Sequence, residues 1–260
     1  MPCSTGAGTK QLQMTQSDAP ATSRIGAILF GIYAWLAFVL CVLSGIVFAL
    51  LLPGLARRRR WVSAAARAAF RLTGMPVKVR GLEKLPAGHC IVVANHASYI
   101  DGVLLFGFMP PRFSFVIKGE MKHFPAVSIL LRRIGARFVE RFDATGSARD
   151  ARFLLKAASS GESFAFFPEG TFRPHPGLGR FRPGAFAAAI KGGMPVVPVV
   201  LSGSRQVLPG RHLLPRHGHL RIDVMTPVEP ADAAYENSRD LAELARQRIL
   251  ELLDEPDLLA

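Results

Sequence analysis

Cysteines and acidic residues are scarce in this chain of 260 residues. None of its three cysteines has the paired spacing of a disulfide scaffold or a cysteine zinc site, so both are excluded. Its 19 acidic residues face 32 lysines and arginines, which gives a formal net charge of +13. The HExxH spacing of zinc enzymes, RNA-binding aromatic motifs and helix-turn-helix patterns are also missing. We therefore expect neither a metal nor a nucleic acid as a partner.

Hydrophobic residues are abundant instead. They make up 50% of the chain, against 20% for charged residues, and this balance excludes an intrinsically disordered protein. A chain that is basic and hydrophobic at once favours anionic membrane lipids as partners. Residues 1–24 differ from the rest, because they are rich in Ser, Thr, Gln and Ala without periodicity. We expect them to form a disordered tail.

Residues 25–52 carry no charged side chain. About 20 apolar residues span a bilayer, so this run is long enough to cross one with some tilt. It is longer than the apolar core of a cleaved signal peptide, and Pro53-Gly54 and a run of arginines follow it. We therefore expect an uncleaved membrane anchor. Its glycines and the Pro53-Gly54 break leave open whether it crosses the bilayer or dips into one leaflet.

Arginines are concentrated after this hydrophobic run. Six lie within residues 57–72, whereas only Lys10 and Arg24 precede the run. The positive-inside rule then places the following domain on the cytoplasmic face of a bacterial inner membrane. Residues 60–72 have the spacing of a basic amphipathic helix suited to anionic lipid, with a polar stripe of Arg60, Ser63, Arg67 and Arg71. The alternative is an ordinary packed helix with a solvated basic face.

From about Met75 the pattern changes to short apolar runs that alternate with helical periodicity. Such alternation predicts an α/β domain with a largely buried sheet. We therefore divide the chain into a tail (1–24), membrane-anchoring helices (25–75) and a catalytic domain (76–260). The expected strands are 77–80, 90–94, 113–117, 136–139, 163–167, 195–201 and 220–225. The expected helices are 102–109, 122–134, 148–159, 184–191 and 240–253.

A histidine and an aspartate follow the second expected strand. His96 comes directly after it, and Asp101 follows five positions later. On a regular helix these side chains diverge by about 140°, so they meet only if His96 lies in the turn before the helix. The carboxylate then fixes the tautomer and stabilises the imidazolium, leaving the second ring nitrogen as a base. No nucleophilic Ser-His or Cys-His signature is present, so the base acts on a substrate hydroxyl.

Two other polar clusters lie at expected strand ends. Arg137 and Arg141 flank a short strand, and arginine suits bidentate phosphate binding. The alternative for this pair is a solvated strand edge. An aromatic strand breaks at Pro168 and presents Glu169 beside Gly170. The glycine lets a ligand or another backbone approach closely, although a solvated turn fits the same residues.

Four blocks, taken in order, resemble the glycerolipid acyltransferase family, and more closely the bacterial 1-acyl-sn-glycerol-3-phosphate acyltransferases. They are Asn95-His96-x4-Asp101, Gly135-x2-Phe138-x2-Arg141, Phe167-Pro168-Glu169-Gly170-Thr171 and Val197-Pro198-Val199. The segments Lys118-Gly119-Glu120-x4-Pro125 and Gly81-Leu82-Glu83 match the same group, and the resemblance covers about residues 76–205. One departure is Phe172, which stands where the family commonly has arginine.

The resemblance implies a mixed sheet flanked by helices and a role for each block. His96 is the general base for the acceptor hydroxyl, and Asp101 orients and charges it. Arg141, with Lys118, binds the acceptor phosphate. The other residues expected to bind substrate are Asn95, Arg137, Glu169, Gly170 and Thr171. The acyl donor is acyl-CoA or acyl-carrier protein, the transfer is direct, and no cofactor is implied.

The implied reaction acylates the sn-2 hydroxyl of 1-acyl-glycerol-3-phosphate (lysophosphatidic acid) and makes phosphatidic acid for phospholipid biosynthesis. Two alternatives remain open. The acceptor can be another lyso-lipid, such as lyso-ornithine lipid, because the motif residues hardly separate such enzymes. The chain can also be a non-catalytic basic membrane-binding protein, although its intact His96 and Asp101 argue against that interpretation.

Overall fold

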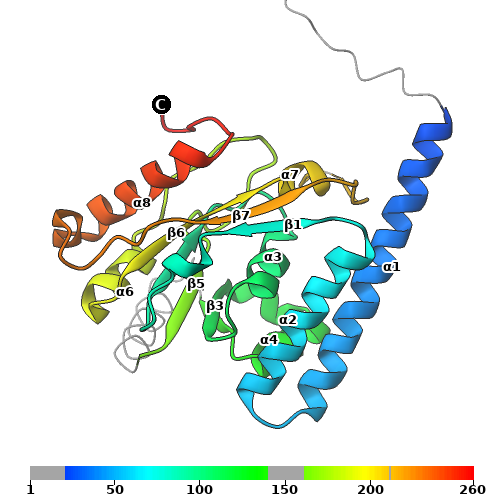
Figure 1. The fold of residues 1–260 in the computed structure, drawn as a ribbon, viewed down its shortest axis with the longest axis horizontal. Helices are drawn as coiled ribbons and strands as arrows, with labels where there is room; N and C mark the ends of the chain where they lie inside the picture. The colour runs from blue at the N-terminus through cyan, green and yellow to red at the C-terminus, as the bar shows by residue number, and fades with distance from the viewer. Residues whose placement is uncertain (1–20, 140–160, 211) are drawn as a thin grey trace, which may run out of the picture.

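Two long helices begin the computed structural model, which describes residues 21–139, 161–210 and 212–260. Helices α1 (Ala21–Leu51) and α2 (Leu55–Leu72) form a hairpin along one side of the molecule (Figure 1). Within the described residues one helical stretch, Arg24–Leu51, is long and apolar enough to cross a membrane, with a mean hydropathy of 2.6. The expected N-terminal apolar helix is therefore present. Residues 1–20 of the expected tail lie outside the described residues.

The described chain forms one seven-stranded sheet, and the predicted mixed α/β fold is confirmed. The strand order is β1-β7-β6-β2-β5-β3-β4. Strands β6, β2, β5, β3 and β4 run parallel, while β7 is antiparallel to β6 and parallel to β1. The bounds are β1 (Val77–Arg80), β2 (Ile91–Ala94), β3 (Phe113–Lys118), β4 (Arg137–Val139), β5 (Ser163–Phe166), β6 (Val196–Ser202) and β7 (Leu220–Val224).

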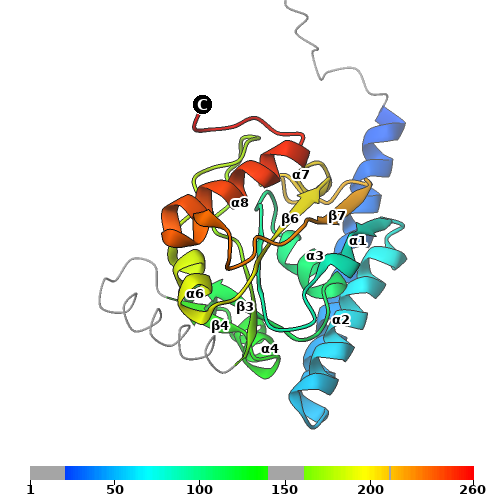
Figure 2. The same cartoon turned by 60° about the vertical axis from the view of Figure 1, so that its left-hand side comes forward.

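Helices cover both faces of this sheet (Figure 2). Alternate residues of β2 point to opposite faces, so Val93 packs with α6 and α8, whereas Val92 packs with α1, α2 and α3. These helices are α3 (Asp101–Phe108), α6 (Gly184–Gly192) and α8 (Ser238–Leu252). The remaining described helices are α4 (Pro125–Arg133), α7 (Ser204–Val207) and the short turns η1 (Leu82–Lys84), η2 (Gly119–His123) and η3 (Ala233–Glu236). The helix expected over 148–159 lies outside the described residues.

The polar stripe expected on α2 is divided between the protein and its surface. Ser63 is buried and donates a hydrogen bond to the Gly107 carbonyl at 2.8 Å. Arg67 donates to the same carbonyl at 2.7 Å, near the C-terminus of α3, where a positive charge is favourable. Arg60 and Arg71 are exposed. The expectation of one continuous lipid-facing stripe is therefore wrong, because half of it packs against α3.

Helix α1 contacts the rest of the protein along most of its length. The Tyr33 hydroxyl donates to the Leu72 carbonyl at 2.7 Å, and the Trp35 indole donates to the Leu213 carbonyl at 2.5 Å. Near the other end of α1, Arg133 donates to the carbonyls of Ala49 and Leu50 at 3.0 and 2.6 Å. The helix therefore lies along the flank of the catalytic domain.

Candidate active site

The predicted catalytic residues lie at the carboxyl ends of neighbouring parallel strands. Strands β2 and β5 are adjacent and parallel, so the segments that follow them meet at one edge of the sheet. His96 lies two residues after the end of β2, and Glu169 lies three residues after the end of β5. Ligands of α/β proteins commonly bind at this kind of edge.

His96 and Asp101 form a hydrogen-bonded pair. The distance between His96 Nδ1 and Asp101 Oδ2 is 3.0 Å. His96 lies in the turn before α3, and Asp101 is the first residue of that helix, which is the arrangement that the five-residue spacing requires. The same carboxylate oxygen accepts the backbone N–H groups of Ala97 and Ser98 at 2.6 and 2.7 Å. These bonds fix the fully buried carboxyl group of Asp101 beside the His96 ring.

The second ring nitrogen of His96 remains available for chemistry. In the part of the chain that the structure describes, Nε2 has no hydrogen-bond partner, and 18% of the side chain is exposed. The ring stacks on Phe167, with centroids 4.3 Å apart, and meets the edge of Phe172 at 5.0 Å. The hydrogen bond to Asp101 assigns the proton to Nδ1, which leaves a lone pair on Nε2. This arrangement can take a proton from a hydroxyl group.

Both carboxylate oxygens of Glu169 accept hydrogen bonds from backbone N–H groups. Its Oε1 accepts the His96 N–H at 2.8 Å, and its Oε2 accepts the Gly179 N–H at 3.0 Å. Burial raises the pKa of Glu169, and the two N–H groups act in the opposite direction. Glu169 therefore ties the segment after β5 to the catalytic turn, and both of its oxygens are occupied within the fold.

Two further motif residues, Asn95 and Gly170, form hydrogen bonds within the fold. The Asn95 amide is buried, donating to the Leu201 carbonyl at 2.9 Å and accepting the Leu201 N–H at 2.7 Å. Gly170 has a φ of 84°, a conformation that favours glycine, and it closes a turn onto the Phe167 carbonyl. Thr171 is exposed beside this turn.

The residues expected to bind phosphate are placed differently from one another. Lys118 ends β3, two strands from β2 at the same edge, which is about 10 Å at normal strand spacing. Its ammonium lies 4.0 Å from the Glu120 carboxylate, and both side chains are half-exposed. Arg141 lies outside the described residues. The structure does not bring Arg137 to this edge.

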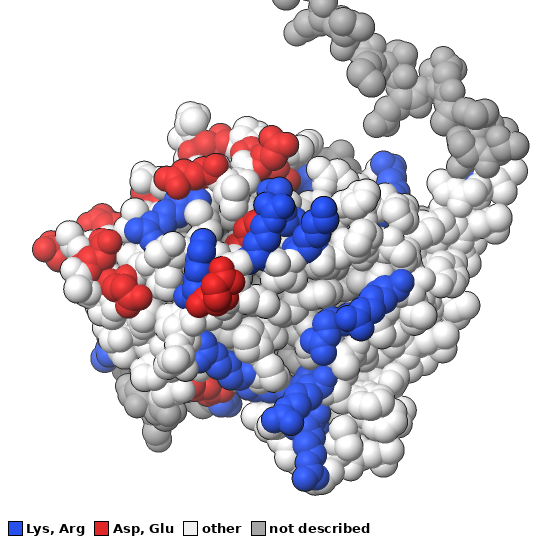
Figure 3. Space-filling model, viewed as in Figure 1, with Lys and Arg blue, Asp and Glu red and all other residues white. Residues whose placement is uncertain are grey.

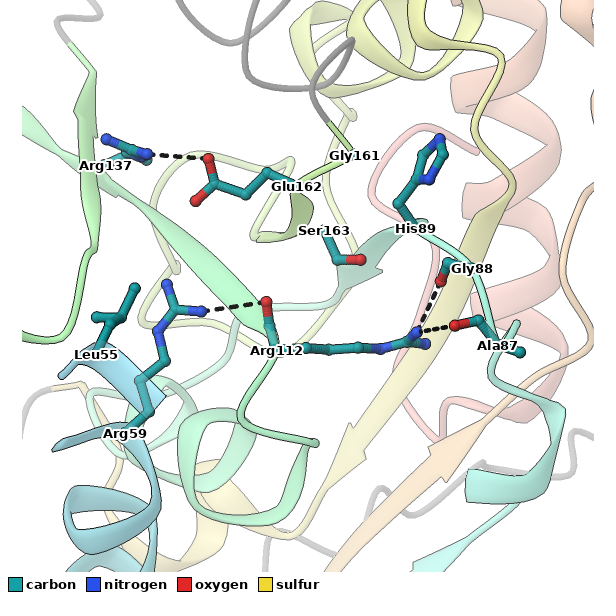
Figure 4. Close-up of a pocket in the computed structure, with 10 residues that line it drawn as sticks. All are labelled: Leu55, Arg59, Ala87, Gly88, His89, Arg112, Arg137, Gly161, Glu162 and Ser163. Carbon is teal, nitrogen blue, oxygen red and sulfur yellow. Dashed lines mark hydrogen bonds and ion pairs between the residues drawn. The ribbon is translucent and has the colours of Figure 1, made fainter. Parts of the chain in front are cut away.

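Arg137 instead lines a cavity of about 530 Å³ at the amino ends of β2, β3 and β5 (Figure 4). Its guanidinium pairs with Glu162 at 2.9 Å, just before β5 begins. Arg59 reaches the same cavity from α2, and Arg112 reaches it from the segment before β3. This amino edge is opposite the edge that carries His96.

The guanidinium groups of Arg59 and Arg112 are largely occupied by backbone carbonyls. Arg59 donates to Ile134 O at 2.8 Å and to the carbonyls of Pro111 and Arg112 at 3.3 and 3.2 Å. Arg112 donates to the carbonyls of Ala87 and Gly88 at 2.7 Å, and also to that of Pro86. Their main task is therefore to hold α2 and the strand-entry loops together.

Sequence reasoning missed an aromatic wall beside His96. Tyr99 is exposed and meets Phe172 edge-to-face, with ring centroids 4.6 Å apart. Phe172 in turn contacts the His96 ring. The available signal was Phe172 itself, which replaces an arginine common at this position of the motif.

Comparisons with known proteins agree with this geometry. A family model described as Acyltransferase matches residues 76–202. A 1-acyl-sn-glycerol-3-phosphate acyltransferase of Haemophilus influenzae is 31% identical over 72% of this chain and 79% of its own. A lyso-ornithine lipid O-acyltransferase of Pseudomonas aeruginosa is 29% identical over 74% of this chain and 75% of its own.

A solved structure is similar over most of the fold. The crystal structure of the 1-acyl-sn-glycerophosphate acyltransferase from Thermotoga maritima matches with a TM-score of 0.72 and 27% identity, covering 88% of this chain and 97% of that one. The ordered motifs, the paired His96 and Asp101 and these relatives lead to one conclusion. The chain belongs to the acyltransferase family that includes the 1-acyl-sn-glycerol-3-phosphate acyltransferases.

Proposed function

We propose that this protein transfers an acyl chain from acyl-CoA or acyl-carrier protein to the sn-2 hydroxyl of 1-acyl-glycerol-3-phosphate, making phosphatidic acid. The observation that carries the proposal is the His96–Asp101 pair at the carboxyl edge of the sheet, with Nε2 open to substrate. The relatives and the shared fold support the choice of acceptor. The protein is then a 1-acylglycerol-3-phosphate O-acyltransferase.

The chemistry needs one base and no acyl-enzyme. Nε2 of His96 takes the hydroxyl proton as the acceptor oxygen attacks the thioester carbonyl. The tetrahedral intermediate collapses, the C–S bond breaks, and the imidazolium returns the proton to the departing thiolate. Asp101 stabilises the imidazolium between these events.

Two possible nucleophiles, Ser98 beside His96 and Cys90 at the amino edge, do not suit a covalent mechanism. The Ser98 hydroxyl is buried and donates to the Leu208 carbonyl at 2.7 Å. Burial raises the pKa of the Cys90 thiol to about 11, so it stays protonated near neutral pH. Direct transfer to the acceptor is therefore the simpler mechanism.

The acceptor phosphate is assigned to basic residues at the carboxyl edge. Lys118 ends β3 at this edge, and Arg141 is kept as its partner from the sequence motif. The turn of Gly170 and Thr171 and the aromatic wall of Tyr99 and Phe172 flank the position where the acceptor hydroxyl meets Nε2. A phosphate contact serves binding in the ground and transition states alike, so it acts chiefly on the acceptor KM.

The packing of α1 supports one membrane arrangement over the other. From Trp35 to Leu50 the helix contacts the catalytic domain over about 22 Å, at about 1.5 Å per residue. A hydrocarbon core is about 30 Å thick, so a perpendicular span would place the domain inside the bilayer. This favours the one-leaflet alternative: residues 25–75 anchor the protein at the cytoplasmic face, and residues 76–260 form the catalytic domain.

The charge distribution supports this arrangement. Figure 3 shows that the flank formed by α1 has almost no charged side chains, that basic side chains lie over the neighbouring α2, and that acidic side chains gather over α8. The exposed face of α1 is apolar, with members such as Ile32, Leu36 and Leu43. An apolar strip bordered by arginines suits an anionic lipid surface.

A second acceptor deserves a direct test, because a lyso-ornithine lipid acyltransferase is about as similar to this chain as the bacterial lysophosphatidic acid enzyme. The test supplies purified protein in vesicles with labelled acyl-CoA or acyl-carrier protein and with either lyso-lipid. We expect product with lysophosphatidic acid to form at least tenfold faster. Faster acylation of lyso-ornithine lipid would transfer the assignment to that acceptor, and no product with either would remove the proposed function.

A further inference from the structure

Arg246 is a fully buried arginine far along the chain from the catalytic motifs. It lies on α8, and only 2% of its side chain is exposed. Burying a guanidinium is unfavourable unless its donors are satisfied, and here Asp257 and Glu243 supply carboxylates. The remaining donors bind one loop, residues 172–183 between β5 and α6. Nε donates to the Gly179 carbonyl at 3.0 Å, and Nη2 donates to the Leu178 carbonyl at 3.3 Å.

The C-terminal segment holds the same loop from another side. Leu178 donates its N–H to the Pro256 carbonyl at 2.9 Å and accepts the Leu258 N–H at 3.2 Å. The Gly177 N–H donates to the Glu255 carboxylate at 2.7 Å. This loop is rich in Gly and Pro and has no regular structure of its own, so these contacts determine its conformation.

Glu255 also connects the C-terminal segment to Arg205 on α7. Arg205 binds its two carboxylate oxygens at 2.7 and 2.9 Å. The same arginine donates to the Arg173 carbonyl at 2.7 Å, at the start of the loop. Arg205 of α7 therefore holds the start of the loop, while α8 and the C-terminal segment hold residues 177–179.

Gly179 connects this loop to the turn that carries His96. The Gly179 N–H donates to Glu169 Oε2, and Glu169 Oε1 accepts the N–H of His96. A continuous series of hydrogen bonds therefore joins Arg246 to the backbone of the catalytic histidine. Arg246 Nη2 binds the Leu178 carbonyl, which shares a peptide unit with the Gly179 N–H, and Glu169 connects that N–H to the His96 N–H. The space around Gly179 is tight, because a Cβ at that position would lie 3.3 Å from Glu169 Oε2.

We infer that Arg246 and the C-terminal segment 253–260 position His96 for catalysis by presenting Gly179 to Glu169. The inference rests on the proposed acyl transfer and adds a positioning role for residues outside the family motifs. If Arg246 is lost, residues 177–179 of the loop become less constrained and Glu169 loses one of its two hydrogen-bond partners. The turn that carries His96 is then held less firmly. Misplacement of a catalytic group by about 1 Å can slow a reaction by about a hundredfold.

Arg248 provides a matched control on the same helix. Its guanidinium also donates to backbone carbonyls, those of Thr226 and Pro227 at 3.2 and 3.4 Å. Among the described residues, however, no hydrogen bond joins that segment to Glu169. The full-length variants Arg246→Met and Arg248→Met are compared with wild type in lysophosphatidic acid vesicles. For Arg246→Met we expect kcat to fall about tenfold or more, with both KM values within about twofold. For Arg248→Met we expect kcat within about twofold.

A double-mutant cycle separates positioning from a general loss of structure. If Arg246 acts through Glu169, Arg246→Met added to Glu169→Gln should lower kcat by less than about threefold. If Arg246→Met does not fold, Glu255→Ala replaces it in the cycle, because Glu255 holds the same loop from a less buried position. Independent, multiplicative losses of kcat would overturn the inference. An unchanged kcat in Arg246→Met, or in Glu255→Ala where that variant replaces it, would also overturn it. Inactive wild type would instead contradict the proposed function.

Discussion

The two edges of the sheet both gather charged side chains, but they use them in opposite ways. At the carboxyl edge, Asp101 and Glu169 bind backbone N–H groups and so hold His96 with one ring nitrogen open. At the amino edge, the donors of Arg59 and Arg112 are bound to backbone carbonyls, and Arg137 pairs with Glu162. The amino edge has a cavity of about 530 Å³ lined by three arginines, yet its groups mostly stabilise the fold.

This difference shows what distinguishes a reactive edge from a structural one. A density of charge is common to both edges. The carboxyl edge differs in that a buried carboxylate, Asp101, holds one ring nitrogen of His96 while the other stays open. The comparison predicts that substitutions at the carboxyl edge chiefly lower kcat, and that substitutions at the amino edge chiefly lower stability.

The largest effect is expected for His96→Ala. Removing a general base typically slows a reaction by about 10²- to 10⁴-fold, and we expect a loss of kcat near 10³-fold. Because the side chain lies partly exposed at the rim, the thermal unfolding midpoint should change little. Transfer of labelled acyl chains measures the rate. A kcat within tenfold of wild type would contradict the role of His96 as base.

The second largest effect is expected for Asp101→Asn, which should lower kcat by about 10²-fold or more. The amide can no longer stabilise the imidazolium, and its NH₂ group conflicts with the N–H donors of Ala97 and Ser98. Stability should fall as well, so kcat is corrected for the folded fraction measured by circular dichroism. The interpretation fails if that correction accounts for the whole loss.

Arg137→Met tests the amino edge. Loss of the half-buried pair with Glu162 should lower the unfolding free energy by about 1 kcal/mol, while kcat and the acceptor KM stay within about twofold. Glu162→Gln is the matched control and should behave alike. A tenfold rise in the acceptor KM for Arg137→Met alone would return Arg137 to the phosphate-binding role that its sequence position suggests.

The smallest effect concerns pH. Burial raises the pKa of Glu169 above its ordinary value of 4.5, so the native state holds this proton more tightly than the unfolded chain. Its contribution to stability is therefore complete below pH 4.5 and is lost as the pH rises through the native pKa. Glu169→Gln should flatten this part of the curve of unfolding free energy against pH. An unchanged slope would assign the titration to another group.

Local features were predictable from the sequence because short-range patterns determine them. The strands are buried apolar runs bounded by Gly and Pro, and their predicted bounds agree with the structure to within a residue or two. The pairing of His96 with Asp101 needs only the turn before α3, so the spacing of the two residues was sufficient to predict it.

Long-range partners were not predictable, because they depend on the order of the strands. Asn95 looked like a substrate ligand, but its amide pairs with Leu201 on the neighbouring β6. Arg137 looked close to the active site, but its side chain reaches Glu162 at the opposite edge. Arg246 gave no sequence signal, because its burial depends on how α8 packs against a distant loop. Its hydrogen bond to Gly179 joins residues 67 positions apart in the sequence.

The most direct test of the account follows release of free CoA from acyl-CoA by the purified protein in vesicles. One reaction contains lysophosphatidic acid, and the other contains an analogue whose sn-2 hydroxyl is replaced by hydrogen. Direct transfer predicts steady CoA release with lysophosphatidic acid, equal to the phosphatidic acid formed, and none above background with the analogue. A stoichiometric burst of CoA with the analogue, or no release with lysophosphatidic acid, would contradict it.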